Sequence, residues 1–328
     1  MPGLRELLRG AIDYAGLFPP ANLEMAPAIQ NYAHYRAEPE AWMLGRFVCP
    51  AARFGELSSL VDARFTAAAP LHVSALGRSG ATQDEFLDQT RQDLVDIAAF
   101  RRRHGERVNV DCFETRLPGA VIATGDVKGL TRLVAASADL IELHGPPTLM
   151  PYYEAALAGD WQTGLAAVFE AIYEDAASEA AEGRERCAPA GFKLRTGGVE
   201  AAAFPASEQI AFVLDGCRRF DLPLKFTAGL HHPIRSYRES VKTKMHGFLN
   251  VMLAALFAYA ANWPQADLTR LLDDEDAADF HSHEDGIGWR QHALDPQAVH
   301  RLRQEYGLTF GSCSFDEPRD DLRALGML

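Results

Sequence analysis

Short apolar runs alternate with longer amphipathic stretches along most of this chain. Runs of about four to eight apolar residues bounded by turn residues predict β-strands. The stretches between them carry apolar residues at helical spacing, as Phe86, Leu94 and Ile97 do within 83–104. The expected helices span 4–9, 25–35, 52–63, 83–104, 126–136, 161–182, 207–220, 248–261 and 296–306.

Eight such runs predict strands that alternate with these helices. They are WMLGRFVCP from Trp42, LHVSAL from Leu71, RVNVDCFE from Arg107, ADLIELH from Ala138, PYYEAAL from Pro151, GFKLRTGG from Gly191, LPLKFTAGL from Leu222 and LTFGSCSF from Leu308.

Eight strands and helices in one series predict an α/β fold, a (β/α)8 TIM barrel formed as a single domain by residues 1–328. Residues 1–40 form an N-terminal helical extension that we expect to close the bottom of the barrel. The alternative, in which Asp13 and Tyr14 reach an active site, stays open. Residues 262–306 form an insertion between the seventh and eighth strands, before the last strand, and it carries a β-hairpin. An open doubly wound sheet is less favoured, because no GxGxxG turn follows the first strand.

Composition restricts the classes of molecule that this protein can be expected to bind. The chain has 328 residues and a formal charge of −13, which argues against nucleic acid and against an anionic membrane surface. Its five scattered cysteines include no CxxC pair, which indicates reduced thiols and a cytoplasmic location. No signal peptide is visible, and the most apolar segment, 248–261, is shorter than the roughly 20 residues that span a bilayer. We expect a small-molecule substrate and no cofactor, and the sequence is compatible with a homo-oligomer.

The C-terminal ends of barrel strands are where catalytic groups gather. Two lysines there, Lys193 and Lys225, would each be costly to desolvate, and each would disfavour the other's charge. A lowered pKa would leave an amine able to form a Schiff base with a carbonyl substrate. The alternative is that each lysine ends its strand in solvent or pairs with Glu142 or Glu154. The strand-end candidates are Glu142, Glu154, Lys193, Arg195, Lys225, Thr227, Ser312 and Ser314.

The turns that follow the two lysines, KLRTGG from Lys193 and KFTAG from Lys225, resemble those of class I aldolases of the deoxyribose-phosphate aldolase kind. The resemblance implies that Lys193 is the Schiff-base lysine and that Lys225 lowers its pKa. ADLIE is similar to the family's proton-relay motif, which implies this role for Glu142, and the turn 311–314 is similar to its phosphate-binding turn.

The chain departs from the aldolase pattern after the seventh strand. Ala228-Gly229 replaces the usual Gly-Gly pair, and His231-His232-Pro233 follows where a compact phosphate loop is expected. The chain also resembles a bacterial TIM-barrel family that shares the lysine turns and the TAGLHHP motif.

Adjacent histidines at a helix start can bind an anion or act as acid or base, so His231 and His232 are site candidates. The H-x-H pair His281 and His283 lies in the expected hairpin, and we expect no metal. Two alternatives remain: a metal-dependent enolase-type enzyme or hydrolase using Glu142, Glu154 and histidines, and a non-catalytic barrel that binds small molecules.

The favoured interpretation is a Schiff-base lyase of the aldolase type, acting on a small aldehyde- or keto-containing substrate that is anionic or polyhydroxylated. Its catalytic residues would be Lys193, Lys225 and Glu142. The expected substrate-binding residues are Arg195, Thr196, Gly197, Gly198, Thr227, Gly229, His231, His232, Ser312 and Ser314.

Overall fold

The computed structural model describes residues 2–61 and 64–328, and its centre is a closed barrel of eight parallel strands in the order β1-β13-β7-β6-β5-β4-β3-β2. The (β/α)8 barrel predicted from the sequence is thereby confirmed. The barrel strands are β1 (Ile12–Tyr14), β2 (Leu44–Pro50), β3 (Leu71–Leu76), β4 (Val108–Arg116), β5 (Met150–Glu154), β6 (Gly191–Arg195), β7 (Leu224–Thr227) and β13 (Gly307–Ser312).

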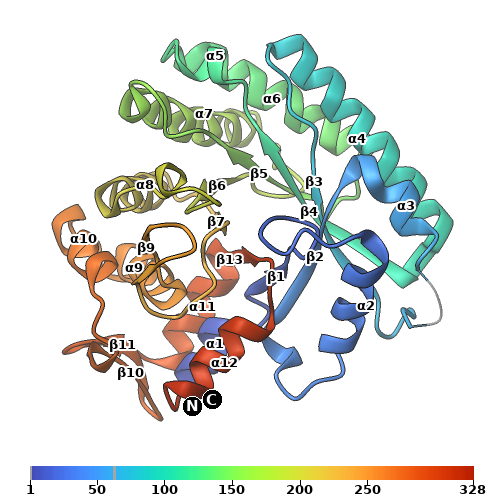
Figure 1. Cartoon of the computed structure of the whole chain (residues 1–328). Helices are drawn as coiled ribbons and strands as arrows, with labels where there is room; N and C mark the ends of the chain where they lie inside the picture. The colour runs from blue at the N-terminus through green and yellow to red at the C-terminus, as the bar shows by residue number, and fades with distance from the viewer. Residues whose placement is uncertain (1, 62–63) are drawn as a thin grey trace.

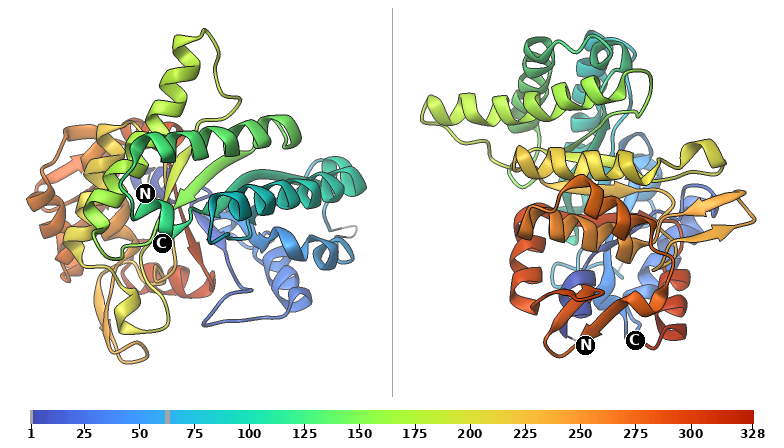
Figure 2. Two further views of the ribbon diagram at one scale, coloured as in Figure 1. Left: turned by 90° about the horizontal axis from the view of Figure 1, so that it is seen from above. Right: turned by 90° about the vertical axis from the view of Figure 1, so that its left-hand side faces the viewer.

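Helices surround the strands and bury one face against them (Figures 1 and 2). Helix α9 (Phe248–Ala261) is buried along most of its length, which accounts for its nearly unbroken apolar sequence. No helix within the described part of the chain is both long and apolar enough to cross a membrane. The other helices are α1 (Pro2–Leu8), α2 (Met25–Tyr35), α3 (Phe54–Ser58), α4 (Gln83–His104), α5 (Gly119–Ile122), α6 (Val127–His144), α7 (Trp161–Ala181), α8 (Ser207–Arg219), α10 (Gln265–Asp273), α11 (Pro296–Tyr306) and α12 (Asp316–Ala324).

The first barrel strand lies inside the segment that we expected to be a helical extension. Strand β1 pairs with β13 on one side and β2 on the other, with Asp13 opposite Gly311 and Tyr14 opposite Phe47. The two expected helices do form, as α1 and α2. The extension is nevertheless part of the barrel wall, because three residues between them close the sheet.

The segment ADLIELH was predicted as the fourth strand, and this prediction is wrong. It forms the last two turns of α6, where Ala138 and Ile141 continue the buried stripe of Leu130 and Val134 at helical spacing. Strand β1 was not predicted, and the strand predicted at 138–144 does not exist. The sixth, seventh and eighth strands therefore keep their predicted numbers. The helix expected over 52–63 ends earlier, with α3, and its last two positions lie outside the described residues.

The insertion before the last strand holds a three-stranded antiparallel sheet where we expected a two-stranded hairpin. Its strands are β10 (Phe280–His283), β11 (Gly286–Trp289) and β12 (His292–Leu294). The sheet packs beside α1, where the Leu4 amide donates to Ser282 Oγ at 3.2 Å (Figure 1). Because α1 precedes the first strand, this sheet lies toward the N-terminal end of the barrel, away from the ends where catalytic groups gather.

A second hairpin, which the sequence did not predict, follows β7. It consists of β8 (Ser236–Arg238) and β9 (Thr243–Met245) and projects from the body of the molecule (Figure 2, right).

Candidate active site

A cavity of about 340 Å³ opens among the C-terminal ends of the barrel strands. Both predicted lysines line it, together with Glu114 from β4 and Glu154 from β5. The loop Phe18–Pro20 after β1 forms part of its wall. A cavity therefore lies where the sequence predicted a site, at the ends of the sixth and seventh strands, and the N-terminal segment contributes to its wall.

Lys193 is held at the floor of this cavity between two carboxylates. In the sheet register it lies opposite Glu154 on β5 and opposite Lys225 on β7. Its Nζ lies 2.8 Å from Glu114 Oε2 and 2.9 Å from Glu154 Oε2, and only 4% of the residue is exposed. Lys193 thus ends in a carboxylate cradle that the barrel strands provide.

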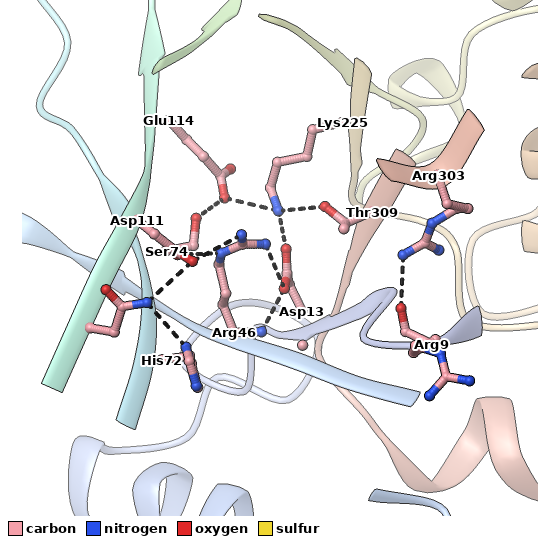
Figure 3. Close-up of polar contacts among 12 residues, drawn as sticks. Arg9, Asp13, Arg46, His72, Ser74, Asp111, Glu114, Lys225, Arg303 and Thr309 are labelled. Carbon is pink, nitrogen blue, oxygen red and sulfur yellow. Dashed lines mark hydrogen bonds and ion pairs between the residues drawn. The ribbon is translucent and has the colours of Figure 1, made fainter. Parts of the chain in front are cut away.

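Lys225 lies in a second buried group of charges, which shares Glu114 with the contacts of Lys193. Its Nζ forms an ion pair with Asp13 from β1, lies 3.4 Å from Glu114 Oε1 and donates to Thr309 Oγ1 at 3.2 Å (Figure 3). Glu114 therefore contacts one lysine through each of its oxygens. The two lysines are coupled through this carboxylate.

Neighbouring strands hold the carboxylates of Asp13 and Glu114 in place. The Arg46 amide donates to Asp13 Oδ1 at 2.6 Å, and the Arg46 guanidinium is paired with Asp111 (Figure 3). Ser74 Oγ donates to Glu114 Oε1 at 2.6 Å. Asp13 and Glu114 are therefore each fixed by a contact beyond their ion pairs with the lysines.

The charge balance of the cluster keeps both lysines protonated. Burial alone would lower the pKa of Lys193 and Lys225, but Glu114 with Glu154, and Asp13 with Glu114, outweigh it and raise both pKa values. Burial would raise the pKa of Glu114, yet the two ammonium groups hold it at about 2. The expectation that Lys225 lowers the pKa of Lys193 is wrong for the free protein, because three carboxylates surround two lysines.

Five of the other predicted residues also line the cavity. They are Arg195, Gly198, Thr227, Gly229 and His231.

Thr196 and Gly197 support the cavity without lining it. Thr196 Oγ1 donates to the carbonyls of Thr227 and Ala228, at 3.1 and 2.5 Å, which ties the turn after β6 to the turn after β7. Gly197 is packed so closely against Gly229 that a Cβ on Gly197 would lie 2.9 Å from the Gly229 Cα. The two Gly-containing turns are therefore a packing contact between neighbouring strand ends.

The two adjacent histidines have different surroundings. His231 lines the cavity, with its Nδ1 3.8 Å from Cys313 Sγ and 3.2 Å from Glu317 Oε2. Burial alone would lower the pKa of His231, but these two contacts raise it to about 9. His232 points to α12, where its Nδ1 lies 2.5 Å from Asp321 Oδ2, and it does not line the cavity.

Ser312 and Ser314 shape the turn after β13. Ser312 Oγ accepts from the Ser314 amide at 3.4 Å, and Ser314 Oγ accepts from the Glu317 amide at 3.1 Å. Neither serine lines the cavity, whereas Gly311 and Cys313 of the same turn do.

Glu142 is not at the site. It lies on α6, where it accepts from the Cys187 amide at 2.9 Å and pairs with Arg186 at 3.2 Å. Its predicted proton-relay role depended on a strand at 138–144, and that segment is helical. The alternative that pairs Glu142 with Glu154 in a metal site fails for the same reason. In the described part of the chain, no group of three or more His, Cys, Asp or Glu side chains is arranged to hold a metal ion.

Sequence reasoning missed Glu114 and Arg116. Both lie at the end of β4, so the rule that selected the two lysines also applies to them. The sequence leaves open whether Asp13 reaches an active site or belongs to a plug at the bottom of the barrel, and the structure places it against Lys225. No strand was predicted for it, because its strand has three residues and shows no alternation.

The chain matches no protein-family model, and no curated protein is significantly similar to it.

Proposed function

We propose that the protein is a lyase of the aldolase type in which Lys193 forms a Schiff base with a small aldehyde or ketone. The observation that supports this most strongly is the position of Lys193 Nζ, buried at the cavity floor within 3 Å of both Glu114 and Glu154. A buried amine with two carboxylates beside it has both the nucleophile and the proton acceptors that imine formation requires.

The first step is removal of a proton from the Lys193 ammonium. Glu114 is engaged by Lys193, Lys225 and Ser74, so it is a poor acceptor. The Glu154 carboxylate, by contrast, is paired with Lys193. We therefore assign Glu154 as the base that takes this proton when a carbonyl group enters the cavity.

Attack of Nζ on the carbonyl carbon gives a carbinolamine. Glu154 returns its proton to the carbinolamine hydroxyl, which leaves as water and gives a protonated imine. The imine carries the same single positive charge as the ammonium that it replaces. The cradle that stabilises the ammonium is thus preorganised for the intermediate.

Glu154, ionised again, takes the proton of the substrate hydroxyl on the β-carbon. The bond between the α- and β-carbons then breaks, its electron pair is accepted by the iminium group, and the β-carbon leaves as an aldehyde or ketone while an enamine remains on Lys193. Glu154 gives its proton to the enamine carbon, and water hydrolyses the resulting imine, which releases the second product and regenerates the Lys193 ammonium.

Lys225 acts as a positioning residue in this scheme. Its pairs with Asp13 and Glu114 keep the Glu114 carboxylate ionised and fix one side of the cradle. Because it remains a buried cation, it also favours the anionic form of each carboxylate nearby.

The proposal is tested by following solvent exchange. The protein is incubated in D2O with short-chain aldehydes and ketones, and deuterium incorporation at the α-carbon is measured by NMR. We expect exchange with the wild type and none with Lys193→Arg, which keeps the positive charge but not the nucleophilic amine. Thermal melting of the variant establishes that it is folded. Equal exchange by both proteins would contradict the role of Lys193.

The raised pKa of Lys193 also favours a second function, a barrel that binds a carbonyl or carboxylate compound without reaction. A protonated Lys193 would then donate hydrogen bonds to the ligand. In that case ligands would bind with no exchange, and Lys193→Arg would retain most of the affinity.

A further inference from the structure

Two arginines form a second layer of charge above the cavity floor. Arg116 follows Glu114 by two positions on β4, and Arg195 follows Lys193 by two positions on β6. Residues two apart on a strand share a face and are separated by about 6.6 Å along it. The arginines thus lie on the same strand faces as the floor residues, one layer nearer to solvent, and both line the cavity.

The charged groups at the cavity floor are paired with opposite charges, whereas the two arginines above them form no ion pair with a described residue. Glu114 and Glu154 are both engaged by Lys193. Arg195 Nε donates to the Gly197 carbonyl at 3.1 Å. The Arg116 side chain forms no hydrogen bond or ion pair with any other residue that the structure describes. Two guanidinium groups are therefore available to a ligand at the cavity mouth.

A second cavity lies beside the two arginines. A neighbouring cavity of about 350 Å³ shares Arg116, Glu154 and Arg195 with the first, and its far wall is formed by Leu157 and by residues 202–205 after β6. The arginines thus stand where the two cavities meet. A ligand that reaches from Lys193 toward solvent on this side must pass them.

We infer that Arg116 and Arg195 bind an anionic end group, a carboxylate or a phosphate, of the substrate whose carbonyl reaches Lys193. This inference rests on the proposed function for the carbonyl end only; the anion site stands on its own geometry. The guanidinium fork presents paired N–H donors that match both kinds of oxyanion. The molecule carries a net charge of −13, so an uncompensated pair of cations in a cleft is a local target for an anion.

The substrate class follows from the spacing of the two layers. A carbonyl at Lys193 and an anion at Arg116 and Arg195 require the two groups to be separated by a few bonds. Short-chain aldehydes or ketones with a terminal carboxylate or phosphate meet this requirement. The anion would then lie on the side of β4 and β6, and not in the turn after β13 that the sequence suggested for phosphate.

The first test measures anion binding without a carbonyl. Succinate and inorganic phosphate are titrated calorimetrically into the wild type, Arg116→Gln and Arg195→Gln. A charged hydrogen bond is worth enough that each arginine variant should bind roughly tenfold to a hundredfold more weakly. Arg102→Gln, which removes an exposed guanidinium on α4, is the control and should be unchanged.

The second test uses charge-matched carbonyl compounds. Succinic semialdehyde is compared with butanal, and glyceraldehyde 3-phosphate with glyceraldehyde, by the dissociation constant of each. Preference for the first pair identifies a carboxylate as the bound group, and preference for the second identifies a phosphate. Equal affinity within both pairs would overturn the inference, as would unchanged anion binding in both arginine variants. Anion binding that persists while Lys193 proves unreactive would contradict the proposed lyase and leave the anion site established.

Discussion

Glu114 is the residue on which the arrangement of the site depends most, because it contacts both lysines and Ser74. Its position could have been predicted, since it ends a strand whose apolar pattern is clear. Its role could not, because the sequence does not show that its two oxygens face two different strands. The same gap explains the wrong expectation for the Lys193 pKa. Two lysines were visible in neighbouring turns, whereas Glu114 was missed and the contact of Asp13 with Lys225 was not foreseen.

Replacing Glu114 with Gln removes a charge that two buried cations share. We expect the free energy of unfolding to fall by about 3–5 kcal/mol, since a buried pair loses one partner. Urea denaturation measures this change. Glu142→Gln is the matched control, because Glu142 is a partly exposed partner of Arg186 on α6, and its loss should cost less than about 1 kcal/mol. Similar costs for the two variants would contradict the central place given to Glu114.

The pair formed by His231 and Glu317 should make stability depend on pH. The pKa of His231 is raised to about 9, above its unfolded value of about 6.5. The stabilisation is therefore fully present below about pH 6.5 and is lost as the pH rises through 9. We expect Glu317→Gln to melt at a lower temperature than the wild type at pH 6 and at the same temperature at pH 10. A difference that grows with pH would have the wrong sign.

At the scale of elements, local pattern predicted most of the barrel. Runs with an apolar core, such as the strands that became β6 and β7, were placed correctly. The errors were of two kinds. The segment ADLIELH has the composition of a strand, but its buried residues Ala138 and Ile141 continue the buried face of helix α6. Strand β1 is too short for any pattern, and its pairing with β13 is visible only when the barrel closes.

The turns after β6 and β7 are predicted to be sensitive to added volume. Gly229 has φ +77°, and a Cβ there would lie 2.9 Å from the Gly197 Cα and 3.1 Å from the Thr196 carbonyl oxygen. Gly229→Ala should therefore destabilise the protein by more than the roughly 1–2 kcal/mol expected from the left-handed backbone alone. The comparison is Gly183→Ala, a glycine with φ +73° and open space around it. Denaturation curves that give equal losses would show that the turns do not pack as described.

At the scale of the whole molecule, the two ends of the barrel have separate roles. The C-terminal ends hold the cavity and its charges, while α1 and the three-stranded sheet of the insertion lie toward the other end. The sequence placed this insertion between strands correctly but did not show what it covers. That information comes from contacts between segments almost the whole chain apart, such as Leu4 and Ser282.

This division predicts that damage to the insertion lowers stability without changing ligand affinity. Trp289 is buried in the sheet, and its Nε1 donates to Asp274 Oδ2 at 2.9 Å. Trp289→Ala should cost about 3–5 kcal/mol, as is usual for a large buried aromatic residue. Titration of the folded variant with succinate should give the dissociation constant of the wild type. A marked loss of affinity would mean that the insertion acts on the cavity.

Trapping of the imine tests directly whether Lys193 is the nucleophile. The protein is incubated with succinic semialdehyde or glyceraldehyde 3-phosphate, reduced with borohydride, digested and analysed by peptide mass spectrometry. We expect one adduct, on the peptide that contains Lys193, in the wild type and in Arg102→Gln, and none in Lys193→Arg. An adduct on Lys225 alone, or no adduct with any of a broad panel of aldehydes and ketones, would contradict the role of Lys193 as the nucleophile.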